Sequence, residues 1–264
     1  MTVDFHTHVF PDALAPKAMK LLTESIDNLY PPVHDGTVSG LINKMDSSGV
    51  DKSVILPVIT KESQVAGTNR WISGVRSERI IGFGGIYPHA EDYKSQIDLV
   101  AGLSLKGIKF HAEYQDFILD DTRMLKIYDY ALEKGLIIVH HAGADPGFTP
   151  PYKTSPERFL NVSRAMKGGV IVAAHLGGHA QWDGVYEILA GGGIYLDTSM
   201  GFSYYEREQF LKIVKKHGSD KILFASDSPW SDAGHEIAQI KSLPLPEGDI
   251  ENILGLNAKK LLSL

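Results

Sequence analysis

The sequence predicts a (β/α)8 TIM barrel, an α/β fold in which eight parallel strands close into a ring inside a layer of helices. Eight short apolar runs alternate with longer amphipathic segments from one end of the chain to the other. These runs are rich in Val, Ile and Leu at both odd and even positions, as expected of parallel strands that are covered on both faces. The length of 264 residues suits one such barrel, so we expect residues 1–264 to form a single domain. An open, doubly wound sheet shares this alternation and is the alternative.

The eight apolar runs are the predicted strands. They are Val3–His6, Ser53–Leu56, Ile80–Ile86, Gly107–Phe110, Leu136–His140, Val170–Ala174, Ile194–Asp197 and Ile222–Ala225. The segments between them have helical periodicity. In Met124–Glu133, for example, Leu125, Tyr128 and Leu132 recur at the spacing of one helix face.

Start and stop signals support the helices between the strands. Ser155-Pro156-Glu157 predicts a helix N-terminus, and Gly135 predicts a helix C-terminus. The region Pro11–Val50 is long enough for two helices. The Gly- and Pro-rich segment Ala144–Thr154 is expected to form a lid or a pocket wall, and Gly248–Leu262 is expected to form a closing helix.

Composition excludes several classes of function. The net charge is −6 and Lys and Arg do not cluster, which argues against nucleic-acid binding. We interpret Lys167, Lys215 and Lys216 as cations near helix C-termini. No apolar run approaches membrane-spanning length, and the first residues do not resemble a signal peptide, so a cytoplasmic protein is expected. The absence of cysteine excludes thiolate catalysis and a Cys-built zinc site.

Polar residues collect at the predicted carboxyl ends of the strands, where enzymes of this fold build their active sites. The segments concerned are Asp4–His8, Gly107–His111, His140–Gly143, His175–Gly178 and Ser226–Trp230. Such a distribution predicts one polar site at the mouth of the barrel.

His6, His8 and Asp227 predict a divalent metal within this site. Side chains two apart on a strand point to the same face, roughly 6–7 Å apart, so His6 and His8 can converge on one ion. Alone, the pair is a weak signal, and Asp227 alone could cap a loop or a helix. In a closed barrel, however, strand eight is hydrogen-bonded to strand one, which brings Asp227 beside the two histidines. This mixed nitrogen and oxygen set suits zinc, manganese, iron or cobalt.

Three further histidines lie at strand ends. His140 and His141 point to opposite faces of their strand, and because both faces are apolar, hydrophobicity does not decide which one enters the site. We expect one to be a ligand and the other a hydrogen-bonded packing residue. His175 precedes Gly177 and Gly178, which allow a close approach. By itself it could be a core histidine, but beside the other strand-end histidines it is a candidate site residue.

Lys109, His111 and Glu113 would share one face if their strand persisted to residue 113. A buried Lys109 could bind a substrate carboxylate, stabilise an oxyanion, or be carboxylated and bridge two metals. The alternative is a lysine at the bottom of the barrel that pairs with a carboxylate. His111 is a further catalytic candidate.

The ordered set of motifs resembles the amidohydrolase-related group (amidohydrolase 2) of the amidohydrolase superfamily. The motifs run in the family's order and cover essentially the whole chain. They are Asp4-x-His6-x-His8, Gly107-Ile108-Lys109-x-His111, His141-x-Gly143, Ala174-His175-Leu176-Gly177-Gly178, Ser226-Asp227-x-Pro229-Trp230 and Ile253-Leu254-Gly255-x-Asn257-Ala258.

The resemblance implies a TIM barrel and assigns the metal ligands. It selects His141 over His140, because the family's histidine stands two residues before a glycine. It makes His175 either a ligand or an acid/base. The implied ligands are His6, His8, His141 and Asp227, with His175 as a further candidate. Zinc is the first choice of metal, with manganese, iron or cobalt as alternatives. One ion is favoured, and a second would require a bridge from carboxylated Lys109 or from Glu113.

The resemblance also implies a class of reaction. We expect a hydrolase that activates a metal-bound water, whose pKa falls toward about 7, for attack on an amide, ester or lactone carbonyl of a small molecule. Asp227 would act as general base and then as general acid, while Lys109 or His175 would help to polarise the carbonyl. The alternative is a lyase that uses the same site, namely a non-oxidative decarboxylase or hydratase of carboxylated substrates, aromatic ones included. Whether the chain forms a homo-oligomer stays open.

Overall fold

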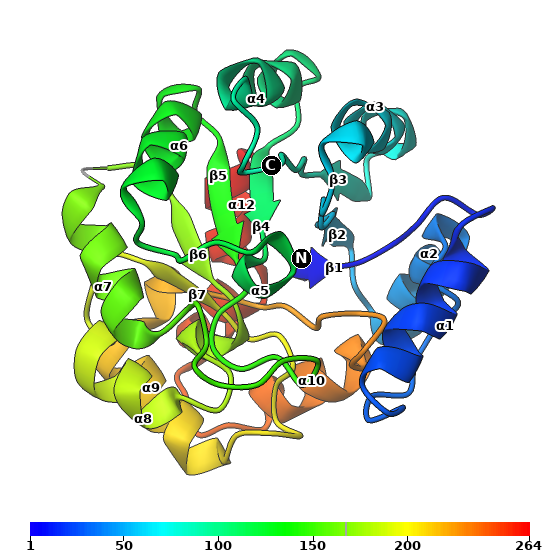
Figure 1. Cartoon of the computed structure of the whole chain (residues 1–264). Helices are drawn as coiled ribbons and strands as arrows, with labels where there is room; N and C mark the ends of the chain where they lie inside the picture. Colours follow the sequence, from blue (N-terminus) through cyan, green and yellow to red (C-terminus); the bar gives the residue numbers. More distant parts are fainter. Residues whose placement is uncertain (167) are drawn as a thin grey trace.

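The computed structural model describes residues 1–166 and 168–264 and contains eight parallel strands alternating with helices (Figure 1). Each predicted strand is present, although most are shorter than expected. The strands are β1 (Val3–Thr7), β2 (Lys52–Ile55), β3 (Ile80–Gly82), β4 (Gly107–Phe110), β5 (Ile137–His140), β6 (Ile171–Ala173), β7 (Tyr195–Asp197) and β8 (Ile222–Leu223).

The strands close into a barrel through two short seams. Regular pairing runs through β1-β2-β3 and through β4-β5-β6-β7-β8. Single parallel bridges then join Gly84 to Ile108 and Thr7 to Ser228. Around the second bridge, Asp227 N donates to His6 O over 2.9 Å. Strand eight therefore meets strand one, which confirms the closed barrel over the open sheet.

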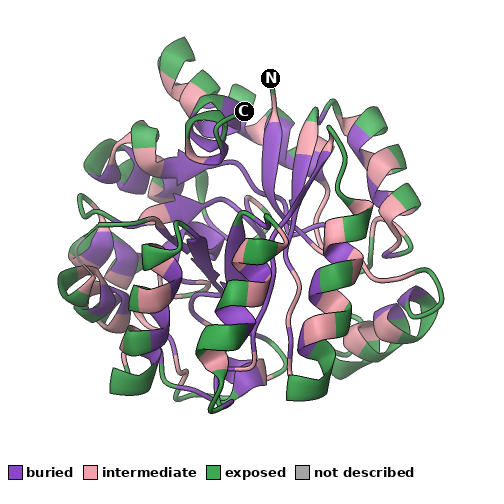
Figure 2. Ribbon diagram, turned by 90° about the horizontal axis from the view of Figure 1, so that it is seen from above, coloured by how far each residue is buried: buried purple, intermediate pink, exposed green. Residues whose placement is uncertain are grey.

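Helices form the outer layer, and Figure 2 shows exposed residues on these helices and buried residues on the strands between them. Their bounds are α1 (Ala15–Ser25), α2 (Val38–Ser48), α3 (Val65–Val75), α4 (Tyr93–Gly102), α5 (Ala112–Gln115), α6 (Thr122–Glu133), α7 (Pro156–Ala165), α8 (Trp182–Gly184), α9 (Arg207–His217), α10 (Ala233–Lys241), α11 (Glu247–Glu251) and α12 (Asn257–Leu262). Short 3-10 or π-type turns are η1 (Glu62–Gln64), η2 (His175–Gly177), η3 (Val185–Leu189), η4 (Ser219–Lys221) and η5 (Asn252–Leu256). No described helix is long and apolar enough to cross a membrane.

The predicted helix signals are found where the sequence places them. Region 11–50 holds the two helices α1 and α2. Ser155 caps α7 by accepting a hydrogen bond from the backbone N–H of Arg158, and Gly135 follows α6 with a φ of +73°. Region 248–262 is helical as predicted, although a π-type turn divides it.

Basic residues near helix ends agree with the sequence interpretation where they are described. Lys215 and Lys216 lie in the last turn of α9, where the helix dipole favours cations. Lys167 lies outside the described residues.

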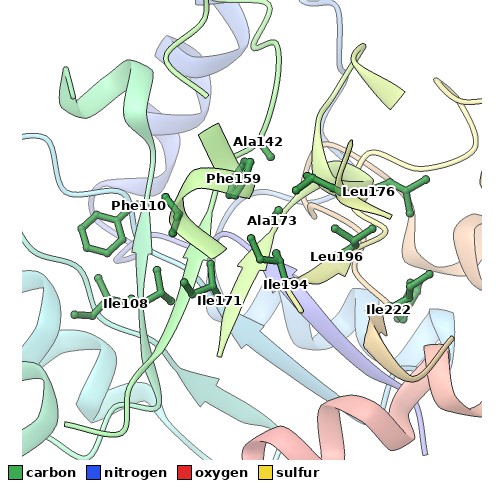
Figure 3. Packing of buried hydrophobic residues seen from close by; sticks show 14 of the residues in the cluster. Ile108, Phe110, Ala142, Phe159, Ile171, Ala173, Leu176, Ile194, Leu196 and Ile222 are labelled. Atoms are coloured by element: carbon green, nitrogen blue, oxygen red, sulfur yellow. The ribbon is translucent and has the colours of Figure 1, made fainter. Parts of the chain in front are cut away.

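Two apolar clusters hold the barrel. The larger cluster lies between strands and helices, and Figure 3 shows Phe110, Ile171 and Leu196 within it. The smaller cluster contains Ile137 and Val139 of β5 and alternate residues of other strands, and it is closed by Ala258 and Leu262 of α12. Since strand side chains alternate in direction, the smaller cluster fills the barrel interior.

Candidate metal centre

Three potential metal ligands converge where β1 and the segment after β8 meet. His6 Nε2 and His8 Nε2 are 3.2 Å apart. Asp227 Oδ1 is 3.3 Å from the first of these atoms and 3.0 Å from the second. The three ligand atoms form one of the candidate metal-binding groups of the described chain. The backbone of Asp227 has a φ of +69°, a conformation that Asp tolerates better than most residues and that is frequent at functional sites.

The hydrogen bonds of Nδ1 in His6 and His8 determine whether Nε2 presents a proton or a lone pair to the other two ligand atoms. His6 Nδ1 lies 2.9 Å from Asp197 Oδ2, and His8 Nδ1 lies 2.7 Å from the carbonyl oxygen of Leu56. Both oxygens only accept hydrogen bonds, so each Nδ1 carries a proton, and in this tautomer Nε2 presents a lone pair. Two lone pairs and a carboxylate oxygen then point at one another, and a cation between them would relieve this repulsion. The donors fit a divalent metal.

The protonation states at neutral pH are those that bind a metal. Burial lowers the pKa of His6, so its ring is neutral. Burial would raise the pKa of Asp227, but the neighbouring His6, His8 and His175 outweigh it and hold this pKa well below its ordinary value. An ionised carboxylate and a neutral imidazole are the ligand forms that coordinate metals.

His141 and His175 repeat this pattern beside the first group. His141 Nδ1 and His175 Nε2 are 2.9 Å apart. His141 Nε2 faces the carbonyl oxygen of Ala144 at 3.2 Å, and His175 Nδ1 faces Ser199 Oγ at 2.9 Å, while that hydroxyl donates to Asp197. The facing nitrogens therefore also carry lone pairs. The ring centroids of His6 and His175 are 5.5 Å apart, so the two groups of imidazoles form one continuous cluster.

The parity of strand five places its two histidines on opposite sides. His141 shares the face of Ile137 and Val139, which fill the barrel, so it lies on the site side. His140 is completely buried on the other side, stacked against Phe110 at a ring distance of 5.2 Å. The expectation of a hydrogen bond for His140 is wrong, since neither ring nitrogen has a partner among the described residues. The aromatic rings that surround His140 offer few hydrogen-bond donors or acceptors, which explains why its nitrogens have no partner.

Lys109 enters the same centre from β4. Its side chain is buried, and its Nζ lies 3.0 Å from His6 Nε2. Burial lowers the pKa of Lys109 to about 8. The alternative of a barrel-bottom lysine paired with a carboxylate is wrong, because the amine faces the histidines and forms no ion pair within residues 1–166 and 168–264.

His111 and Glu113 point in different directions, because β4 ends at Phe110 and α5 begins at Ala112. Glu113 turns away from the centre and accepts a hydrogen bond from the backbone of Lys153 over 2.6 Å, so the structure offers no support for it as a metal bridge. His111 stacks on His141 at a ring distance of 4.1 Å, and its Nε2 lies 3.1 Å from Asp145 Oδ2. Burial lowers the pKa of His111 well below its ordinary value.

Sequence reasoning assigned no role to the acidic residues that support these side chains. Asp197 ends β7 and orients His6, and this position at a strand end was the signal that could have revealed it. Asp4 accepts hydrogen bonds from the backbone and hydroxyl of Ser226, and burial raises its pKa to about 7. Asp145 lies in the segment predicted as a pocket wall, where an isolated Asp gives no signal.

A cavity of about 690 Å³ opens onto the ligand group. This volume lies within the roughly 300–1,000 Å³ of small-molecule sites. The segment 144–154 contributes Ala144, Asp145 and Pro146 to its wall, in agreement with the expectation of a pocket wall.

Known proteins of this fold provide an independent comparison. No curated protein matches the chain in sequence. Among solved structures, an IDCase from Metarhizium anisopliae is 19% identical with a TM-score of 0.74 and covers 100% of this chain and 97% of its own. A 5-carboxyvanillate decarboxylase from Novosphingobium aromaticivorans, solved with manganese and 4-hydroxy-3-methoxy-5-nitrobenzoic acid, is 15% identical with a TM-score of 0.77 and coverages of 100% and 96%. At these identities the likeness establishes the fold.

A third solved structure is named for hydrolysis. A protein of Pseudomonas putida, provisionally named a 2-pyrone-4,6-dicarboxylic acid hydrolase, is 15% identical with a TM-score of 0.67, and the match covers 99% of this chain and 97% of that one. The family model described as amidohydrolase matches residues 3–264. Because this match spans nearly the whole barrel and every strand that builds the centre, the chain belongs to the amidohydrolase family.

Proposed function

We propose that the protein is a metal-dependent hydrolase that cleaves an amide, ester or lactone of a small molecule. The observation that carries the proposal is the convergence of His6 Nε2, His8 Nε2 and Asp227 Oδ1 within 3.3 Å of one another. His141 is the proposed fourth ligand, and zinc is the proposed ion. Once bound, such an ion supplies a Lewis acid and lowers the pKa of a bound water toward about 7.

The residues of the chain have distinct proposed roles. Asp227, ionised at neutral pH, accepts a proton from the attacking water and returns it to the leaving group. Lys109, with a pKa of about 8, donates a hydrogen bond to the oxygen on which negative charge develops. His175 faces the same space with a lone pair on Nε2, so it is the proposed further ligand or the group that accepts a proton there. Its backbone is held at a φ of +55° by contacts to Asp197 and Ser199.

A lyase is the second candidate, and a specific observation favours it. Several solved structures with this fold are decarboxylases, including the manganese-bound 5-carboxyvanillate decarboxylase. In that reaction the same ligand group would hold an ion that binds the substrate's oxygens. His175 would take up a proton and pass it to the carbon from which CO2 departs. Manganese would then be the more natural metal.

Metal analysis followed by a substrate panel tests both candidates. The purified protein, loaded with zinc or manganese and freed of excess ion, is expected to retain one ion per chain. It is then assayed against amides, esters and lactones for acid release, and against aromatic carboxylates for release of CO2. Failure to retain any ion would overturn the metal-dependent assignment, and CO2 release without hydrolysis would replace the hydrolase by the lyase.

A further inference from the structure

The cavity extends well beyond the proposed metal ligands into a zone with mostly apolar walls. Its inner end is lined by His6, His8, Lys109, His141 and Asp227. Its outer part lies between α1 and the segment that runs from β2 into α3. A small polar group that reaches the inner end would leave this outer part empty, so the shape indicates a longer ligand.

One wall of the outer part is an apolar stripe of α1. Leu14, Leu21, Leu22 and Ile26 line the cavity at helical spacing, next to the stripe with which α1 packs on the barrel. Leu14 and Leu21 remain 57% and 56% exposed, which places two large apolar side chains in water at the mouth of the cavity. An apolar group in the cavity would remove these surfaces from water.

The facing wall combines apolar side chains with neutral polar ones and leaves space. It is lined by Pro57, Val58, Gly67 and Trp71 together with Thr60, Ser63, Gln64 and Thr68. A Cβ built at Gly67 would meet no atom within 4 Å, so this glycine leaves part of the cavity open. A larger side chain at position 67 would narrow the cavity without touching the metal ligands.

Charge restricts what the outer part can hold. Of the residues that line it between α1 and α3, Lys17 alone carries a charge, and its side chain is exposed. A second carboxylate or a phosphate at this end would lose its hydration without gaining a buried partner, which is costly. An uncharged hydrocarbon group has no such cost.

We propose that the substrate carries its reacting carbonyl on an extended apolar chain, aliphatic or aryl-aliphatic, that lies between α1 and α3. This inference rests on the proposed function, because it places the carbonyl at the metal centre. It names the substrate class as hydrophobic acyl or alkyl derivatives rather than small dicarboxylates.

Straight-chain hydroxamic acids of two to ten carbons test the proposal, since the hydroxamate binds a divalent ion and the chain reports on the cavity. With the metal-loaded protein, calorimetry is expected to give an affinity that rises about threefold to fourfold for each added methylene. The rise should stop when the chain fills the cavity. An affinity that does not depend on chain length would overturn the proposal.

Substitutions on the two facing walls of the cavity test where the alkyl chain of the hydroxamate lies. Gly67→Phe is expected to reduce the ratio of octanohydroxamate to acetohydroxamate affinity by at least about tenfold. Gly74→Phe is its matched control, because Gly74 is exposed on the same helix, lies outside the cavity lining and likewise has open space where a Cβ would stand. Equal ratios in the two variants would overturn the proposal. Leu21→Gln, with Lys20→Gln as control, applies the same test to α1 with little change in helix propensity.

A metal-free measurement separates this inference from the proposed function. The neutral dye N-phenyl-1-naphthylamine is expected to bind the metal-free protein, to be displaced by octanol, and to bind more weakly to Leu21→Gln. If the protein retains no metal but the dye behaves in this way, the proposed function fails and the apolar channel stands. If the dye does not bind, the channel fails. If Leu21→Gln dissociates a dimer and leaves dye binding unchanged, the leucines serve a second copy instead, which also overturns the proposal.

Discussion

His6 Nδ1 donates to Asp197 Oδ2 over 2.9 Å, and the other oxygen of the same carboxylate accepts from the backbone N–H of His175 over 3.0 Å. Asp197 is completely buried. One carboxylate from β7 therefore orients a proposed ligand on β1 and fixes the strained turn that presents His175. Carboxylates in this position fix the tautomer of a metal-binding histidine and raise its basicity.

Asp197→Asn is expected to weaken metal binding by about 10- to 100-fold, the usual loss when a residue that supports a ligand is removed. Competition with a fluorescent chelator measures the affinity. Asp129→Asn, at an exposed position on α6, is the matched control and should bind metal normally. Equal affinities in the two variants would show that Asp197 does not act through His6.

Asp227→Asn is expected to leave a folded barrel that lacks turnover. The amide removes both a ligand charge and the proposed general base, a role that contributes about 100- to 10,000-fold to rate. Circular dichroism checks the fold, elemental analysis the metal content, and the substrate panel the rate. Near-normal activity in a folded variant would rule out the role assigned to Asp227.

Lys109→Met is expected to bind the metal more tightly and to turn over more slowly. With a pKa of about 8, Lys109 is mostly protonated at pH 7 and opposes a nearby cation. Loss of its proton at pH 7 costs about 1.4 kcal/mol, so the variant should gain up to about tenfold in affinity. The gain should vanish near pH 9, where wild-type Lys109 is neutral. Loss of a second ion in the variant would instead support a carboxylated, bridging lysine.

His217 predicts a loss of stability in acid that is independent of the metal. Burial lowers its pKa to about 4, while Nδ1 accepts from Gly191 N and Nε2 has no partner among the described residues. The unfolded chain takes up this proton near pH 6.5 and the folded chain only near pH 4, so acid favours unfolding. The stabilisation is complete above pH 6.5, and about 3 kcal/mol is lost as the pH falls through 4.

His217→Asn is expected to flatten this part of the pH profile, because the amide oxygen can accept from Gly191 but does not titrate. Urea unfolding between pH 7 and 4 measures the effect. His235→Asn, at an exposed histidine on α10, should retain the wild-type slope. A wild-type slope in His217→Asn would contradict the assignment.

The parts of the site that the sequence predicts are those that depend on strand order and parity. Barrel closure places Asp227 beside His6 and His8, because the last strand of a closed ring must meet the first. The side of β5 on which His141 lies follows from alternation, once the site side is known. All eight strands could be located from apolar runs, because parallel strands covered on both faces are apolar at odd and even positions alike.

The parts that could not be predicted depend on where strands stop and how loops return. Glu113 would have shared the face of Lys109 on a longer strand, but β4 ends at Phe110 and a helical turn redirects it. Asp145 reaches His111 from a loop whose path has no periodicity. His140 shows a further limit, since a histidine in an aromatic cage has the same sequence signal as one with hydrogen-bond partners.

The pairing of β1 with the segment after β8 also determines when the proposed ligands can meet during protein synthesis. His6 is synthesised before Asp227, which follows 221 residues later (227 − 6). At about 5–20 residues per second, the two histidines wait roughly 10–45 s for their carboxylate partner. We therefore expect the proposed set of metal ligands to be complete only in chains whose barrel has closed.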